Sequence, residues 1–348
     1  MNAHAALPTL NAALAALVVP TGGASVALVH ADAGTALAEL PCMAEQSSKP
    51  AFDGIAARGW PAYSGVEGFG PARIPTAPQV IVLLLPRVRA LGRAELARAW
   101  IALPAGGWLL AAGHNDEGVR GFEKDLGALG PLTRTMSKHH GRAFWLQKAE
   151  APDAAAQALA AQWIAADAPR LDAGSGLWLR PGVFNEGRLD GGSALLIEHL
   201  PARLGGRAAD LGAGSGLLAR ALLERCEGVR SVDLFEAEAR ALDLAQRNLE
   251  GARAPVALHW HDVAQGVPGR FEVVVCNPPF HVGSRSVPAL GRAFIAAAAR
   301  ALVPEGELWL VANRHLPYED ALRERFGHGT RIAEAGGFKV FRAWAPRA

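Results

Sequence analysis

The sequence has little of several features that mark particular protein classes. Its 3 cysteines, Cys42, Cys226 and Cys276, form no CxxC pair, so we expect neither a disulfide scaffold nor a cysteine zinc site. The net charge is only +2, short of the basic excess of dedicated nucleic-acid binders, although a local patch could still bind RNA. The apolar run at residues 10–19 is too short for a bilayer and lacks the flanks of a secretory signal. We therefore expect a cytoplasmic protein.

The length and an internal repeat predict two similar domains. A chain of 348 residues exceeds what one core usually fills. Residues 90–115 resemble residues 289–315, each with a helix-like stretch, a Pro-x-Gly turn and an apolar strand, and residues 141–149 echo residues 337–345. Alanine-rich helices can look alike by composition alone, but the matched blocks keep their order and nearly their spacing. Duplication of one α/β domain is favoured, with domains at 1–165 and 166–348.

Strands alternate with helices in the second half, which predicts a mostly parallel, doubly wound sheet of seven strands. The last two strands lie too close together for a crossover helix, so we expect an antiparallel hairpin at the end of the sheet. The expected strands are residues 208–211, 231–235, 256–260, 272–276, 307–312, 331–333 and 338–344.

A glycine loop follows the first of these strands. Asp210 and the glycines at positions 212, 214 and 216 give the pattern D-x-G-x-G-x-G, in which the backbone can turn tightly and approach a ligand. The dinucleotide fingerprint would need glycine at Leu217, so the loop argues against a nicotinamide or flavin cofactor. Taken alone, Gly212, Gly214 and Gly216 could also form a tight turn that binds nothing.

Polar side chains end the next three strands as well. Glu236 ends the second strand, Asp262 the third and Asn277 the fourth. Open α/β sheets bind their ligands at the carboxyl ends of their strands. Any one of these residues could be a surface cap, but four in register favour a binding site.

This pattern resembles the class I S-adenosylmethionine-dependent methyltransferases. The resemblance implies that Asp210 and the glycines hold the methionine part of the cofactor. It also implies that Glu236 holds the ribose and Asp262 the adenine amino group. Such a reaction requires no metal.

The strand that ends at Cys276 runs into Asn-Pro-Pro-Phe, a turn that suits methylation of an amino group. A conjugated amino nitrogen is a poor nucleophile, and two acceptors that hold its hydrogens can turn the lone pair towards a methyl carbon. The Asn277 side-chain oxygen and the Pro278 carbonyl could be those acceptors, while Phe280 offers a stacking face. Adenine N6, cytosine N4, guanine N2 and a glutamine amide all fit this logic, with Phe280 favouring a base.

A longer resemblance narrows the substrate. Residues 181–201, the run NPPFHVG, residues 308–322 and residues 336–344 are similar to the bacterial ribosomal RNA guanine-N2 methyltransferases of the small subunit. This implies guanine N2 of 16S ribosomal RNA as the substrate. A 23S guanine, another nucleobase or a protein glutamine remains an alternative, as does an inactive RNA-binding protein. The segment with Phe184, Asp190 and Ser193 could cover the cofactor or simply begin a helix.

We expect the first domain to be catalytically inactive, to bind RNA and to stabilise its partner domain, in a chain that acts as a monomer. Its equivalent of the Asn-Pro-Pro turn reads Leu85-Pro86-Arg87, which lacks the amide, and no glycine loop precedes it. A basic run beside Phe144 and Trp145 could meet phosphates, or it could be a solvated loop. Its members are Arg134, Lys138, His139, His140 and Arg142.

Overall fold

The computed structural model describes residues 4–16, 25–37, 41–66, 77–183, 190–279, 281–282, 285–286 and 288–347. The chain divides into two compact units. Unit 1 comprises Met1–Ala168 and Arg180–Gly182, and unit 2 comprises Pro169–Leu179 and Val183–Ala348. In the described parts of the chain, no helix has the length and apolar character needed to span a membrane.

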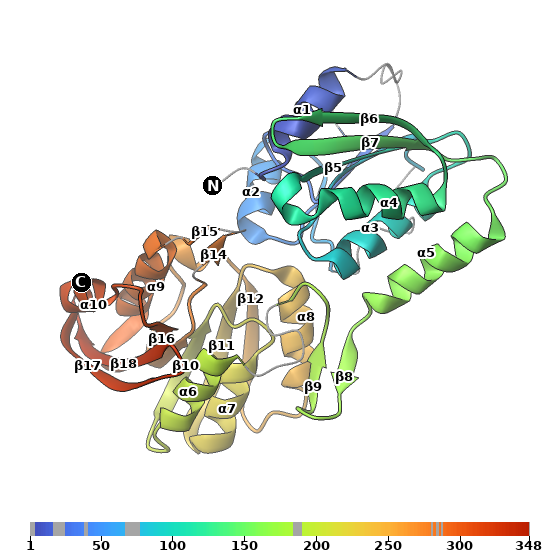
Figure 1. Ribbon diagram of the computed structural model, residues 1–348. Helices are drawn as coiled ribbons and strands as arrows, with labels where there is room; N and C mark the ends of the chain where they lie inside the picture. The colour runs from blue at the N-terminus through green and yellow to red at the C-terminus, as the bar shows by residue number, and fades with distance from the viewer. Residues whose placement is uncertain are drawn as a thin grey trace. The chain divides into compact units, whose positions relative to one another are not determined.

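Unit 1 is a seven-stranded sheet with helices on both faces (Figure 1). Five strands are parallel and β7 and β6 close the sheet as an antiparallel hairpin, in the order β3-β2-β1-β4-β5-β7-β6. The strands are β1 (Val26–Val29), β2 (Met43–Glu45), β3 (Ala62–Tyr63), β4 (Val80–Leu84), β5 (Trp108–His114), β6 (Leu132–Lys138) and β7 (Gly141–Gln147). The helices are α1 (Leu7–Ala15), α2 (Lys49–Ala57), α3 (Arg89–Ala102), η2 (Asn115–Glu117), α4 (Val119–Leu129) and α5 (Ala154–Ala166).

The core of unit 1 forms two layers because successive strand residues point to opposite faces. Leu28 packs with α1 and α2, whereas its neighbour Ala27 packs with α3, α4 and α5. Strand β4 is buried along its whole length, as expected for a central parallel strand covered on both sides.

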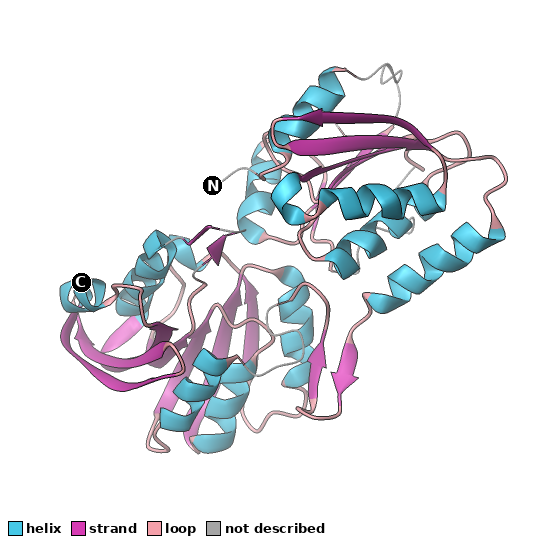
Figure 2. Ribbon diagram, viewed as in Figure 1, coloured by secondary structure: helices cyan, strands magenta, loops and turns pink. Residues whose placement is uncertain are grey.

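Unit 2 repeats this topology, with the strand order β12-β11-β10-β13-β16-β18-β17 (Figure 2). Its sheet strands are β10 (Gly205–Leu211), β11 (Gly228–Glu236), β12 (Val256–Trp260), β13 (Phe271–Cys276), β16 (Leu302–Asn313), β17 (Phe326–Ala335) and β18 (Phe338–Pro346). Two small hairpins pair β8 (Arg170–Asp172) with β9 (Leu177–Leu179), and β14 (His281–Val282) with β15 (Arg285–Ser286). The helices are α6 (Gly191–His199), α7 (Leu217–Arg225), α8 (Ala239–Asn248), η3 (Val263–Gln265), α9 (Pro288–Ala301) and α10 (Glu319–Arg325).

Two apolar layers also cover the sheet of unit 2. Val273 and Val275 face α6, α7 and α8, whereas Val274 and Cys276 face α9 and α10. The last four residues of β13, Val273 to Cys276, therefore form a continuous apolar run, because both faces of the strand are buried there. It ends where Pro278 and Pro279 offer no backbone donors to continue the ladder.

The predicted α/β fold, the duplication and the terminal antiparallel hairpin of unit 2 are all confirmed. The repeat differs by one residue from the alignment seen in the sequence. His114 pairs with Gly141 in unit 1, and Asn313 pairs with Phe338 in unit 2. Gly141 is thus equivalent to Phe338 and not to Gly337. The Arg180–Gly182 segment returns to unit 1, which a single boundary in the sequence does not describe.

Candidate active site

The strand register of unit 2 brings the predicted polar residues to one edge of the sheet. Leu211 pairs with Phe235 on one side and with Cys276 on the other. The residues that follow these three positions, Gly212, Glu236 and Asn277, therefore stand side by side at the carboxyl ends of β10, β11 and β13. Asp262 follows β12, the next strand along the sheet.

The glycine loop after β10 leaves room for a ligand. Gly212, Gly214 and Gly216 all have left-handed backbones, with φ of 72°, 55° and 83°, which glycine adopts without strain. A Cβ placed on Gly214 would meet nothing within 4 Å. The loop opens directly into α7, whose amino end places backbone amides next to it.

Asp210 has a buried carboxylate with one oxygen left unpaired by the described residues, as expected for a residue that binds a cation. Its carboxylate is fully buried, and one oxygen accepts a hydrogen bond from the Ala219 amide at 3.0 Å. The other oxygen, Oδ1, has no hydrogen-bond partner within the described residues. Burial raises the pKa of Asp210 to about 7, against the opposing effect of the Ala219 bond. A bound ammonium group would supply the missing partner.

Glu236 links the glycine loop to the end of β11. Its carboxylate accepts the Gly214 amide and the Glu238 amide, each at 2.8 Å. Burial raises the pKa of Glu236 although these bonds oppose the shift. A carboxylate has about four acceptor positions, so capacity remains for the hydroxyls of a ribose.

Asp262 has a local role as well as its position in the site. It caps η3 by accepting the Ala264 amide at 3.0 Å, and it accepts the Gln265 side chain at 3.2 Å. Trp260, two residues earlier, donates its ring N–H to the Ala237 carbonyl at 2.8 Å and so ties the end of β12 to the loop after Glu236.

The Asn277 amide is oriented by the start of α6. Its Nδ2 donates to Asp190 Oδ2 at 2.8 Å and to Ser193 Oγ at 2.9 Å. The same Asp190 oxygen accepts the Ser193 amide and caps the helix. A carboxylate can only accept, so the atom facing Asp190 must be Nδ2. Asn277 Oδ1 then points the other way, and no described residue donates a hydrogen bond to it.

An aromatic wall of this site was not anticipated from the sequence. A Cβ on Gly212 would lie 3.0 Å from the Phe294 ring and 3.8 Å from Pro279, so these two side chains pack against the loop. Phe294 is the one aromatic residue of the alanine-rich helix α9, and that isolation is the signal that could have identified it. Phe184 and Phe280, also expected near the site, lie outside the described residues.

Unit 1 has an amide, that of Gln46, at the position equivalent to Glu236: its side-chain oxygen accepts the backbone amide two residues ahead at 2.9 Å, as the Glu236 carboxylate does at 2.8 Å. The carboxylate of Glu45 lies one position earlier, and its Oε2 accepts the His30 amide at 3.0 Å. Glu45 is only 2% exposed, and a Cβ on Gly65 would lie 1.6 Å from Oε1. The backbone of the loop after β3 thus covers the Glu45 carboxylate at the carboxyl end of β2.

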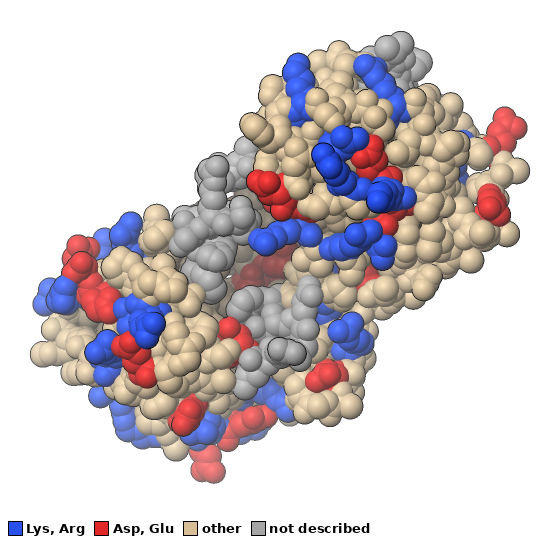
Figure 3. Space-filling model, in the orientation of Figure 1, with Lys and Arg blue, Asp and Glu red and all other residues tan. Residues whose placement is uncertain are grey.

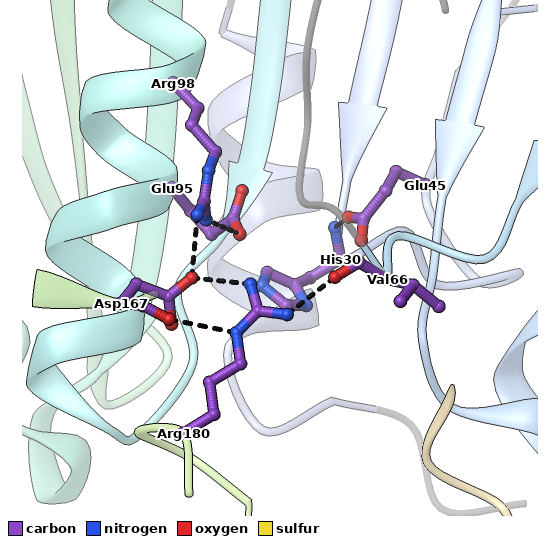
Figure 4. Close-up of polar contacts among 7 residues, drawn as sticks. All are labelled: His30, Glu45, Val66, Glu95, Arg98, Asp167 and Arg180. Atoms are coloured by element: carbon purple, nitrogen blue, oxygen red, sulfur yellow. Dashed lines mark hydrogen bonds and ion pairs between the residues drawn. The ribbon is translucent and has the colours of Figure 1, made fainter. Parts of the chain in front are cut away.

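Arg180 fills the space next to this position (Figure 4). Its guanidinium donates to the Val66 carbonyl at 2.6 Å and to Asp167 Oδ2 at 2.7 Å. Asp167 also accepts Arg98, which in turn holds Glu95. All four charged side chains of this network are at most 9% exposed, so protein occupies what would be the ligand edge of the unit 1 sheet.

The basic run expected to meet RNA forms the β6–β7 hairpin of unit 1. Lys138 is exposed, and Arg134 is exposed with its guanidinium 5.4 Å from the centre of the Trp145 ring. Arg142 instead makes a two-pronged ion pair with Glu123, with contacts of 2.6 and 2.8 Å. Its charge is therefore partly neutralised, whereas Arg134 and Lys138 remain accessible. Phe144 and Trp145 are buried and belong to the core.

Comparison with known sequences gives the family. A family model described as methyltransferase small domain matches residues 174–342. Ribosomal RNA small subunit methyltransferase C of Pseudomonas aeruginosa (strain LESB58) is 33% identical over 303 residues, which are 82% of this chain and 89% of that protein. The protein of the same name from Escherichia coli (strain K12 / DH10B) is 30% identical over 265 residues, covering 76% and 74%.

A solved structure agrees over both units. The T. thermophilus 16S rRNA N2 methyltransferase (RsmC), determined in complex with AdoMet and guanosine, matches with a TM-score of 0.78 at 28% identity. The match covers 97% of this chain and 91% of that one. The chain belongs to the ribosomal RNA small subunit methyltransferase C family.

Proposed function

We propose that this protein transfers a methyl group from S-adenosylmethionine to the N2 amino group of a guanine in 16S ribosomal RNA of the small subunit. The observation that carries the proposal is the Asn277 amide, held by Asp190 and Ser193 so that its oxygen is available beside the glycine loop. Membership of the family supports the substrate.

The residues present fit the cofactor. The unpartnered Asp210 Oδ1 suits the ammonium of the methionine part, and the open backbone at Gly214 gives it room. Gly212 and Gly216 shape the same loop. Glu236 would accept the ribose hydroxyls, and Asp262 would accept the adenine amino group. S-adenosylmethionine, when bound, supplies an electrophilic methyl carbon on a positively charged sulfur.

The chain contributes geometry to the reaction. Asn277 Oδ1 and the Pro278 carbonyl would accept the two hydrogens of the guanine amino group, and Phe280 would stack on the base. The nitrogen lone pair, freed from conjugation with the ring, then forms the new bond to carbon as the carbon–sulfur bond breaks and its electron pair stays on sulfur. Methylation makes the nitrogen acidic, and the extra proton passes to solvent. None of these steps needs a deprotonating side chain or a metal.

Unit 1 takes no part in the chemistry in this proposal. The covered Glu45 and the buried Arg180 network leave no room for a cofactor, and Leu84-Leu85-Pro86 stands where unit 2 has its Asn-Pro-Pro turn, one position earlier than the sequence alignment gave. Unit 1 would bind RNA, with Arg134 and Lys138 as contacts and Arg142 contributing less, and stabilise unit 2. One chain carries both functions, so we propose a monomer that acts in the cytoplasm, where ribosomal subunits are assembled.

Transfer of labelled methyl groups to isolated 30S subunits, 50S subunits and total protein tests the proposal, with nucleoside analysis of the labelled RNA. N2-methylguanosine in 30S subunits is the expected result. Label in 50S subunits, in another nucleoside or in protein would contradict the substrate while leaving the mechanism. Complete lack of label would favour a protein that only binds RNA.

A further inference from the structure

Equivalent two-residue hairpin turns in the two units consist of different residues. The β6–β7 hairpin of unit 1 turns through His139 and His140, with φ of 52° and 56°. The equivalent β17–β18 hairpin of unit 2 turns through Gly336 and Gly337, with φ of 58° and 85°. The residue after the adjoining central strand bonds the second turn residue in both cases, Asn115 N to His140 O at 2.9 Å and Arg314 N to Gly337 O at 2.8 Å.

This backbone conformation is costly for histidine. Two-residue hairpin turns of this type need positive φ at both positions, and glycine and asparagine are the residues that fill them readily. Unit 2 uses glycine at both positions, so the fold itself does not require side chains there. Retained strain of this kind points to a use for the side chains that create it.

The two imidazoles are presented to solvent from an anchored backbone. His139 and His140 are both exposed. Next to them, the Lys138 carbonyl accepts the Thr9 hydroxyl at 2.8 Å. A Cβ on Gly141 would lie 2.4 Å from Thr9 Oγ1, so the base of the turn is closely packed. The rings therefore extend from a rigid support, which limits the entropy lost when they bind a partner.

The surroundings favour a polyanion. Exposed Lys138 adjoins the turn, and Lys and Arg side chains, with some Asp and Glu side chains between them, lie over α3 and α4 of the same unit (Figure 3). Two arginines of α3, Arg89 and Arg93, share the single carboxylate of Asp125, so positive charge remains in excess at that site. The acidic residues close to the turn are Asp116 and Glu117 of η2, which adjoins the turn through the Asn115 to His140 bond.

We infer that the tip of the β6–β7 hairpin, Lys138 to His140, is a point at which unit 1 contacts ribosomal RNA. The inference rests on the proposed function, which makes RNA the substrate. Lys138 would meet a phosphate, while the imidazoles would stack on unpaired bases or donate to the backbone. This chemistry suits single-stranded RNA better than a protein surface, because an imidazole pair beside a cation matches a base beside its phosphate.

The test replaces the turn of unit 1 with the turn that unit 2 already uses. We expect H139G/H140G to bind transcribed 16S ribosomal RNA about fivefold to tenfold more weakly, as measured by filter binding. Its melting temperature should stay equal or rise, because the strained backbone is relieved. The affinity for S-adenosylmethionine should not change. K138Q should also weaken RNA binding and reduce the salt slope by about 1.

R230Q is the matched charge control, because Arg230 is 73% exposed near the amino end of β11, away from the site edge. Its RNA affinity should equal that of the unaltered chain. Unchanged RNA affinity in H139G/H140G would overturn the inference, and so would a lower melting temperature, which would make the imidazoles part of the fold. Failure of the unaltered chain to methylate RNA would instead contradict the proposed function.

Discussion

At the scale of single residues, the site depends on which way one amide points. Asn277 can accept a substrate hydrogen only through Oδ1, and the two ends of an amide differ in nothing but their hydrogen-bonding capacity. Asp190 removes the ambiguity, because its carboxylate binds the donor end at 2.8 Å. Asp190 is therefore a positioning residue in this proposal, and Asn277 is the catalytic one.

Two substitutions of Asp190 separate this role from helix capping. Serine and asparagine are both good N-caps, but only asparagine keeps an acceptor of similar reach. We expect D190S to lower kcat about tenfold to a hundredfold with the Kd for S-adenosylmethionine unchanged, and D190N to restore most of the loss. Steady-state kinetics with 30S subunits and calorimetry would measure both quantities.

A double-mutant cycle supplies the control for this prediction. N277A should lower kcat by about two orders of magnitude or more, and D190S/N277A should be no slower than N277A alone, because Asp190 acts through Asn277. Losses that multiply in the double variant would show that Asp190 serves the reaction, or the fold, independently of Asn277.

Asp210 makes cofactor binding depend on pH. Its pKa of about 7 in the free protein is caused mainly by burial, and a cationic ligand favours the ionised carboxylate. The Kd for S-adenosylmethionine should therefore fall roughly tenfold between pH 6 and pH 7.5, as the ionised fraction grows. Calorimetry in buffers of different ionisation enthalpy would also detect the proton released on binding.

The D210N variant checks the source of that dependence, since it should bind weakly with little change over the same pH range. The free energy of unfolding depends on pH in the opposite direction to the cofactor affinity. The native carboxyl holds a proton between about pH 4 and pH 7 that the unfolded chain has released, so the free energy of unfolding decreases as pH rises through this window. A cofactor affinity that is flat with pH in the unaltered chain would contradict the assignment of Asp210.

At the scale of elements, long buried strands were predictable and short or distant features were not. All seven expected strands of unit 2 occur, because runs such as residues 273–276 are apolar on both faces. Strand β17 is longer than expected: it runs along the sheet edge with mostly exposed residues, which show no apolar period. Strands β2 and β3 of unit 1 have three and two residues, too few for any pattern.

The candidate site also contains residues that could be predicted from the sequence and contacts that could not. Asp210, Glu236 and Asn277 were identifiable because each ends or closely follows an apolar strand. The partnership of Asp190 with Asn277 was not, since the two residues lie 87 positions apart and only the fold joins them. The sequence also does not reveal that Arg142 forms an ion pair with Glu123.

At the scale of the whole molecule, duplication supplies an internal control. Glu236 borders an open glycine loop after β11, whereas the equivalent position after β2 is the amide of Gln46, and the preceding Glu45 is covered by Gly65. The same topology therefore carries a carboxylate open to a ribose in one unit and none at that position in the other. Divergence changed the loops and kept the sheet, as expected when function lies in the segments that follow the strands.

This asymmetry predicts one cofactor per chain and a clear difference between a substitution of the open carboxylate of unit 2 and one of the covered carboxylate of unit 1. E236Q should raise the Kd for S-adenosylmethionine about tenfold or more, because hydrogen bonds to a charged acceptor are worth roughly 1.5 to 3 kcal/mol. E45Q should leave both the Kd and the stoichiometry unchanged, with its folding checked by circular dichroism. Titration calorimetry measures the Kd of each variant and the number of cofactor molecules bound per chain. Two equivalents bound per chain, or a weakened affinity in folded E45Q, would mean that unit 1 holds a cofactor and that its edge opens in solution.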